Sequence, residues 1–322
     1  MKEQFKGKTI AVIGDSITAH GKHFYYIRSY MQQSKDKCYL YNRGTGGNRA
    51  VMFPYLFDEE IKELKADYVM ISYAGNDMGV WLYDALKPVT EELLAKRKAR
   101  DDEYFESYRK SIQVVKDYGA IPIVVSPFAM DEYLVEKEYI ETLADNDEKE
   151  DNIKPSFYTR ATYRNLNQAL KGYAEKLKVI AEEMGAEYMP AFEKTYQEML
   201  KQTGMFGQDG LHYNFEVGYK YLAKIFLEYL GCEDIPKEFV KTPENDEIEK
   251  LEQLERHAGM LKRATPYNGY FGTFTDEEME ENARKNVREC SGWVAEYAQL
   301  YLDHYKELPS LRAKIRELTE KL

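Results

Sequence analysis

The sequence predicts an α/β fold, a three-layer α/β/α doubly wound parallel sheet that is followed by an all-helical C-terminal extension. Three short apolar runs carry this prediction: Thr9–Ile13, Tyr68–Ser72 and Ile121–Val125. Each is bounded by Gly, Pro, Asn or Asp, as expected for strands that are buried on both faces of a parallel sheet. Longer stretches with helical spacing separate the runs, and this alternation favours right-handed crossover connections.

The remaining elements of the sheet region follow in chain order. A weaker strand is expected at Cys38–Tyr41, and helices are expected at residues 21–34, 56–64, 101–118, 161–184 and 215–230. Two connections, Met78–Arg100 and Met130–Ser156, are rich in charge and Tyr and are longer than ordinary strand–helix loops. They are expected either to form lids or walls over a site, or to be surface helices with no role in substrate choice.

The character of the sequence changes after Gly231, where a polar stretch with two Pro residues is typical of a linker. We therefore expect one domain over residues 1–235 and a helical extension over residues 236–322. Thr275 followed by Glu278 fits a capping box. Three apolar stripes at helical spacing lie in the extension: Ile248, Leu251, Leu254, Ala258 and Leu261; Val287, Cys290, Val294, Tyr297, Tyr301 and Leu308; and Leu311, Ile315, Leu318 and Leu322.

These stripes have three candidate partners. They would pack on the α/β domain, on a second copy of the chain, or on a foreign protein. A homo-oligomer formed through the C-terminal helices is one of the expectations that the sequence leaves open.

Composition limits the classes of function. The 322 residues are 43% hydrophobic, which is enough for a sizeable core, and 56 acidic against 45 basic residues leave a net charge of −11. Such a surface repels phosphate backbones, so we expect no nucleic-acid partner. No run approaches the roughly 18 apolar residues of a membrane span, and no signal peptide is recognisable. We expect no membrane partner and a cytoplasmic location, or secretion if a leader has been removed.

A candidate nucleophile and its base lie far apart in the sequence. Ser16, in Gly14-Asp15-Ser16, directly follows the first strand, where a sharp turn exposes a hydroxyl for attack. His212 would accept its proton, and Asp209 three positions earlier would orient the imidazole. Each motif has a structural alternative when it is taken alone, because a Ser after a strand is commonly a helix N-cap.

The other four histidines are poorer candidates for the base. His20 and His23 follow Ser16 too closely to fold back onto it easily, and His257 and His304 lie in the extension.

Two further segments stand where an oxyanion hole would be needed. Residues 42–48, after the second strand, contain glycines that permit a tight turn and an unobstructed backbone N–H. Asn76, after the third strand, carries a side-chain N–H that can donate to developing negative charge. A plain Gly-rich turn and an Asx turn are the structural alternatives.

Taken together, Ser, Gly, Asn and Asp-x-x-His in this order resemble the SGNH/GDSL hydrolase family, which is named after these residues. The blocks IAVIGDSIT, NRGTGGNR and DGLHYNFEVGYKYLA agree with it, and the resemblance covers about residues 8–230. It implies a flavodoxin-like fold and an ester hydrolase. It also implies roles for five residues: Ser16 as nucleophile and oxyanion donor, Gly47 and Asn76 as further donors, His212 as base, and Asp209 as its orienter.

The sequence departs from the family pattern in a few places. Ala74 stands where the third block usually has Gly, and Gly44 and Gly46 remain alternatives to Gly47 as the donor. A conventional member has no such long C-terminal extension. No phosphate-binding loop, dinucleotide fingerprint or His/Cys metal spacing is present, so neither a cofactor nor a metal is expected. Cys38, Cys232 and Cys290 are too few and too widely spaced for a disulfide framework.

The substrate is inferred from composition. Members of the family act on acetylated sugars, lipids, thioesters and other esters, and the 28 Tyr residues favour an esterase that removes acetyl groups from carbohydrate. The alternatives are an acyltransferase to sugar hydroxyls, a lipase or thioesterase, and a non-enzymatic binding protein. Asp15, Arg49 and Asp77 are candidate substrate contacts, and Arg43 or Arg49 would suit an anionic group.

Overall fold

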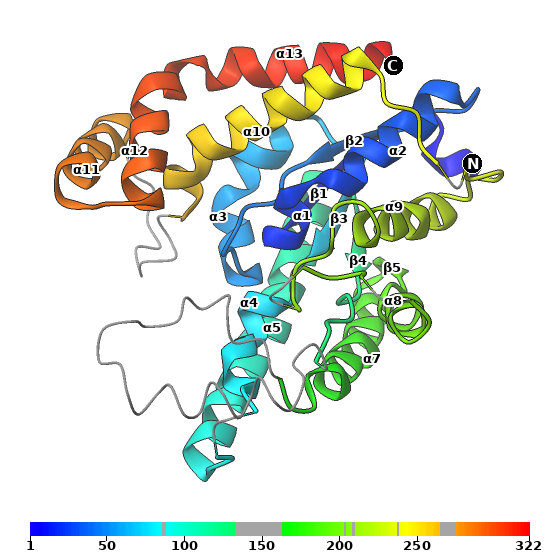
Figure 1. Ribbon diagram of the computed structural model, residues 1–322, viewed down its shortest axis with the longest axis vertical. Coiled ribbons are helices and arrows are strands. Elements are labelled where there is room, and N and C mark those ends of the chain that lie inside the picture. Colours follow the sequence, from blue (N-terminus) through cyan, green and yellow to red (C-terminus); the bar gives the residue numbers. More distant parts are fainter. Residues whose placement is uncertain (86–87, 133–162, 203, 208–209, 237, 265–274) are drawn as a thin grey trace.

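The computed structural model describes residues 1–85, 88–132, 163–202, 204–207, 210–236, 238–264 and 275–322 (Figure 1). Its centre is a parallel five-stranded sheet in the order β2-β1-β3-β4-β5. The strands are β1 (Thr9–Gly14), β2 (Tyr39–Asn42), β3 (Tyr68–Ser72), β4 (Ile121–Val125) and β5 (Glu187–Met189). The four expected strands and the doubly wound α/β fold are confirmed. This strand order reverses beside β1, where ligands gather in such folds.

The strand β5 was not expected from the sequence. It is three residues long, and only Met189 among them is buried. No apolar run marks it, because a short edge strand needs few buried side chains.

Helices cover both faces of the sheet (Figure 1). The α-helices of this region are α1 (Ser16–His20), α2 (Lys22–Gln33), α3 (Phe53–Phe57), α4 (Gly75–Met78), α5 (Glu91–Tyr118), α7 (Leu166–Met184), α8 (Phe192–Met199) and α9 (Gly218–Tyr229). Shorter turns are η1 (Glu3–Phe5), η2 (Ala50–Met52), the π-helical η3 (Asp58–Lys62) and η4 (Val80–Tyr83). α2 packs on α9, whereas α5 packs on α3 and α7.

The first of the two long connections ends in a helix. The last ten residues of Met78–Arg100 form the first turns of α5, which begins at Glu91, and so follow the surface-helix alternative. Thr90 caps this helix by accepting a hydrogen bond from the Leu93 N–H at 3.1 Å. The second connection, Met130–Ser156, lies almost entirely outside the described residues. The helix expected from residue 161 begins at Leu166.

The Tyr residues serve the core more than the surface. Several Tyr side chains are fully buried: Tyr25, Tyr41, Tyr73, Tyr104, Tyr108, Tyr219 and Tyr301. The hydroxyls of Tyr104 and Tyr108 donate to the Tyr73 carbonyl at 2.7 and 3.0 Å, just beyond the end of β3. Buried phenols need such partners, and here they fix the backbone that leads to Asn76.

Two of the C-terminal helices contact the α/β domain, in agreement with the first of the three alternatives, and the other two pack on each other, one of them also on the first C-terminal helix. The C-terminal helices are α10 (Pro243–Ala264), α11 (Asp276–Glu289), α12 (Trp293–His304) and α13 (Leu308–Lys321), with the turn η7 (Tyr305–Glu307) between the last two. α10 and α13 run side by side, and α10 packs against α2 (Figure 1). The capping box of Thr275 and Glu278 is present at the start of α11. The boundary between residues 235 and 236 stays a prediction.

Two of the apolar stripes are arranged differently from expectation. The stripe from Val287 to Leu308 is divided among three helices, because the chain breaks between α11 and α12, where Gly292 has a φ of 61°. On α13 the buried positions are Leu308, Arg312, Ile315 and Thr319. Ile315 agrees with the predicted stripe, whereas Arg312 and Thr319 are buried in place of their neighbours Leu311 and Leu318. The shift arises because Arg312 is buried in an ionic cluster. None of the helices in the described part of the chain carries an apolar stretch that would reach across a bilayer.

Candidate active site

Ser16 lies at the first position of α1, immediately after β1. Asp15 is the N-cap, since its carboxylate accepts a hydrogen bond from the Ile17 N–H at 3.0 Å. The N-cap role, which was the structural alternative for Ser16, is therefore taken by Asp15. Gly14 permits the turn, because a Cβ there would meet the Ser72 carbonyl oxygen and Thr18 Oγ1 at 2.3 Å. Ser16 itself is half-buried.

His212 is brought to Ser16 across 196 residues. Its Nε2 lies 2.7 Å from Ser16 Oγ, which is the distance that proton transfer requires. An isolated bridge between Phe206 and Tyr213 holds the segment, and the His212 carbonyl accepts from the Gly207 N–H at 2.7 Å. Asp209 lies outside the described residues, so its role as orienter of the imidazole stays a prediction.

The Gly-rich loop crosses the ends of β1 and β2. The Thr45 N–H donates to the Gly14 carbonyl at 2.9 Å, and the Gly44 N–H donates to Asn42 Oδ1 at 3.0 Å. Gly44 is required for packing, because a Cβ there would lie 2.4 Å from the Ala19 nitrogen. Gly47 instead has space around it and a φ of 78°, a left-handed conformation that favours glycine. Hydrogen bonds from its own backbone N–H groups thus hold the loop beside Ser16.

Asn76 joins the third block to the Gly-rich loop. Its side-chain Nδ2 donates to the Asn48 carbonyl at 3.2 Å. A primary amide has two N–H donors, so this bond uses one and fixes the plane in which the second points. Arg100 Nη1 in turn donates to the Asn76 carbonyl at 3.0 Å. Ala74, the departure from the family pattern, leaves Asn76 in place at the start of α4.

The carboxylates of Asp15 and Asp77 support loops, and the structure does not bear out their prediction as substrate contacts. Both side chains are buried. Asp77 Oδ1 accepts from the Ala50 N–H at 2.8 Å, and burial raises the pKa of Asp77 to about 8. Burial also raises the pKa of Asp15, against the opposing effects of the Ile17 N–H and the His212 charge.

The two arginines near the loop are engaged with carboxylates of the protein. Arg49 forms an ion pair with Glu103 on α5. Arg43 is buried between Glu60 and Glu255, at 3.9 and 3.7 Å. The suggestion that Arg43 binds an anionic ligand is therefore wrong, because its guanidinium faces the interior.

His20 is not the base, as expected, but its ring lies beside that of His212, which the sequence did not predict. Its ring lies edge-on to the His212 ring with 4.9 Å between centroids, and 6.0 Å from the ring of the exposed Phe215. The spacing could have predicted this position, because Ser16 and His20 are four residues apart and a helix places such residues on one face. His23, by contrast, is buried, and burial lowers its pKa to about 3.

Comparison with known proteins decides the family. The model of the GDSL-like lipase/acylhydrolase family matches residues 12–220. The chain belongs to this family. It is accordingly a GDSL-type ester hydrolase, and the matched region includes Ser16, Gly47, Asn76, Asp209 and His212. A search of curated proteins found no significant match.

Solved structures extend the comparison of this GDSL hydrolase. The acetylxylan esterase Axe2 from Geobacillus stearothermophilus shares 20% identity at a TM-score of 0.51, covering 72% of this chain and 98% of Axe2. BT4096, a gut microbial diltiazem-metabolizing enzyme, shares 14% identity at a TM-score of 0.67, covering 99% of this chain and 96% of its own. Identities this low show a common fold alone. The second match includes the helical extension.

Proposed function

We propose that this GDSL hydrolase removes acetyl or other short acyl groups from carbohydrate esters through an acyl-enzyme on Ser16. The observation that carries the catalytic part is the 2.7 Å separation of Ser16 Oγ and His212 Nε2. A neutral imidazole at this distance takes the hydroxyl proton as the oxygen attacks.

The proposed reaction has two halves. Ser16 Oγ bonds to the ester carbonyl carbon while His212 takes its proton, and the resulting oxyanion is held by the Ser16 and Gly47 N–H groups and the Asn76 amide. The bond to the leaving alcohol then breaks as His212 returns the proton to it. Water next attacks the acyl-enzyme with His212 as base, which releases the carboxylic acid and restores Ser16.

The carbohydrate part rests on the surface beside His212. Phe215 is 52% exposed and follows His212 by three residues, and the His20 ring contacts the rings of both. An exposed ring next to the base gives a sugar ring an apolar face against which to pack. The neighbour Axe2 is named for activity on acetylxylan, which agrees with this assignment. The abundance of Tyr no longer supports it, because so many of the Tyr side chains are buried.

The experiment compares the wild type with Ser16→Ala on p-nitrophenyl acetate and on acetylated xylooligosaccharides. We expect release of free acetate by the wild type and loss of turnover in Ser16→Ala with an unchanged melting temperature. Undiminished acetate release by the variant would refute the role of Ser16. Transfer of acetyl to an added sugar, in place of free acetate, would refute hydrolysis in favour of acyl transfer.

A further inference from the structure

The helix α10 of the C-terminal extension reaches the nucleophile. A Cβ placed on Gly46 would lie 3.4 Å from Met260 Cε and 4.0 Å from Ser16 Cβ. The Met260 methyl group and the nucleophile therefore flank the same glycine, next to the proposed oxyanion donor Gly47. Met260 is half-buried. Met260 thus lies at the site, although it comes 40 positions after the end of the matched family region.

Polar contacts along α10 fix this helix on the α/β domain. Arg28 of α2 donates to Asn245 at 2.8 Å and to Glu252 at 3.0 Å, and both guanidinium and carboxylate are buried. Lys22 pairs with Glu249 at 3.0 Å. These contacts lie on three successive turns of α10, so they define its position along α2.

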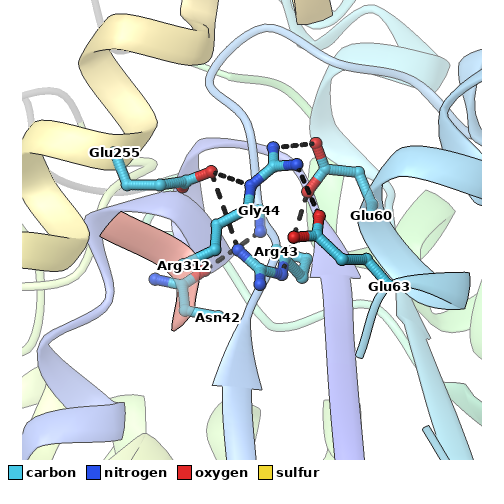
Figure 2. Close-up of polar contacts among 7 residues, drawn as sticks. All are labelled: Asn42, Arg43, Gly44, Glu60, Glu63, Glu255 and Arg312. Atoms are coloured by element: carbon cyan, nitrogen blue, oxygen red, sulfur yellow. Dashed lines mark hydrogen bonds and ion pairs between the residues drawn. The ribbon is translucent and has the colours of Figure 1, made fainter. Parts of the chain in front are cut away.

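A buried ionic cluster joins α10 to the Gly-rich loop itself. Figure 2 shows Arg43 and Arg312 directed toward the carboxylates of Glu60, Glu63 and Glu255. Glu255 of α10 lies 2.7 Å from Arg312 Nε and 3.7 Å from Arg43 Nη1. Arg43 directly precedes Gly44, so the backbone that carries Gly46 and Gly47 is tied to the helix that carries Met260.

Such a cluster favours one arrangement over others. Buried charges tolerate little displacement, because moving them apart leaves each charge buried without a partner. The spacing between the loop and α10 is therefore well defined, and so is the space between Met260 and Ser16.

We propose that α10 is a wall of the substrate site and that Met260 limits the size of the ester group on the Gly46 side of Ser16. This inference rests on the proposed esterase function. A thioether side chain fills irregular apolar space, and a pocket wall discriminates about tenfold or more for each methylene that it admits or excludes. The extension then acts as a specificity element that the matched family region lacks.

The test measures kcat/KM of Met260→Ala and Met260→Phe on two substrate series. One series lengthens the acyl chain from acetyl to hexanoyl on p-nitrophenol, and the other places acetyl on alcohols of increasing size. A wall touches one side of the ester, so the change is expected in one series only. In that series Met260→Ala is expected to raise the ratio of long to short substrates about tenfold, and Met260→Phe to lower it.

The controls separate this inference from the esterase assignment. Met184→Ala removes an equally half-buried Met at the end of α7, next to the start of β5 and away from Ser16, and is expected to keep the wild-type profile. Met260→Phe keeps the space filled, so it tests the inference independently if the alanine variant is unstable. Unchanged ratios in both series for Met260→Ala and Met260→Phe would overturn the inference. A wild type that hydrolyses no ester would refute the proposed function instead.

Discussion

Arg312 of the last helix contacts Glu60 of the π-helical turn η3, with 3.5 Å between Nη2 and Oε1, across 252 residues of chain. Both side chains are buried. The contact joins the C-terminal extension to the α/β domain beside residues 42–44, at the start of the Gly-rich loop (Figure 2).

Removal of Arg312 is expected to destabilise the protein strongly. Arg312→Ala leaves the buried Glu60 and Glu255 without the guanidinium that both contact, and breaking a buried ionic group in this way costs about 3–5 kcal/mol. Lys314→Ala is the matched control on the same helix, since its ion pair with Glu247 is about half exposed. We expect that control to cost about 1 kcal/mol or less. Denaturant unfolding measures both, and equal losses would contradict the account.

Asp77 is expected to make stability depend on pH. Its pKa is about 8 in the folded protein, against an ordinary value of 3.8, mainly because the carboxylate is buried. The folded protein thus holds this proton more tightly than the unfolded chain, so the free energy of unfolding falls as pH rises from about 4 to about 8, by at most about 1.4 kcal/mol per pH unit. Asp77→Asn keeps an acceptor for the Ala50 N–H and removes the ionisation.

The difference in unfolding free energy between Asp77→Asn and the wild type is therefore expected to grow in favour of the variant over that pH range. Urea unfolding at pH 5, 6, 7 and 8 measures it. All other titrating groups are common to both proteins, so parallel curves would show that Asp77 does not hold a proton in the folded state.

The Asn76 amide is expected to act on the transition state. Asn76→Ala removes one proposed oxyanion donor and is expected to lower kcat about 100- to 1,000-fold with little change in KM. The hydrogen bond from Arg100 to the Asn76 carbonyl involves only the backbone of Asn76, so the substitution leaves it in place. Steady-state kinetics on p-nitrophenyl acetate supply the measurement. A rise in KM at constant kcat would instead place Asn76 in ground-state binding.

Phe215 is expected to affect sugar substrates selectively. Phe215→Ala removes the exposed ring near His20 and His212, so KM for acetylated xylooligosaccharides should rise severalfold while p-nitrophenyl acetate is hydrolysed as before. Leu200→Ala, at a residue of similar exposure just after α8, is the control. Equal effects on both substrates would argue against a sugar surface at this position.

The sequence predicted the sheet well because buried parallel strands are continuous apolar runs with clear boundaries. β5 escaped prediction because it contributes a single buried side chain, Met189. The candidate site could be predicted for a similar reason. Ser16 and Asn76 follow strands that end at one edge of the sheet, and His212 lies in a sequence block that resembles the family's. His20 required a view of α1 as a helix, which brings the fourth residue after Ser16 to the same face.

The role of the extension could not be read from apolar spacing. Helix α13 buries Arg312, and α2 buries Arg28, so the contacts that fix α10 are ionic and involve residues that sequence patterns assign to the surface. The partners of these arginines lie more than 200 residues away, with the exception of Glu255. Only the folded arrangement shows that Met260 stands next to Gly46.

The central claim is that Ser16 is a nucleophile activated by His212. A fluorophosphonate ester that mimics the tetrahedral intermediate, followed by peptide mass spectrometry, tests it most directly. The account predicts one adduct per chain on Ser16, formed far more slowly in His212→Ala and absent from Ser16→Ala. Equal labelling of His212→Ala and the wild type, or an adduct on another residue of an active enzyme, would contradict it.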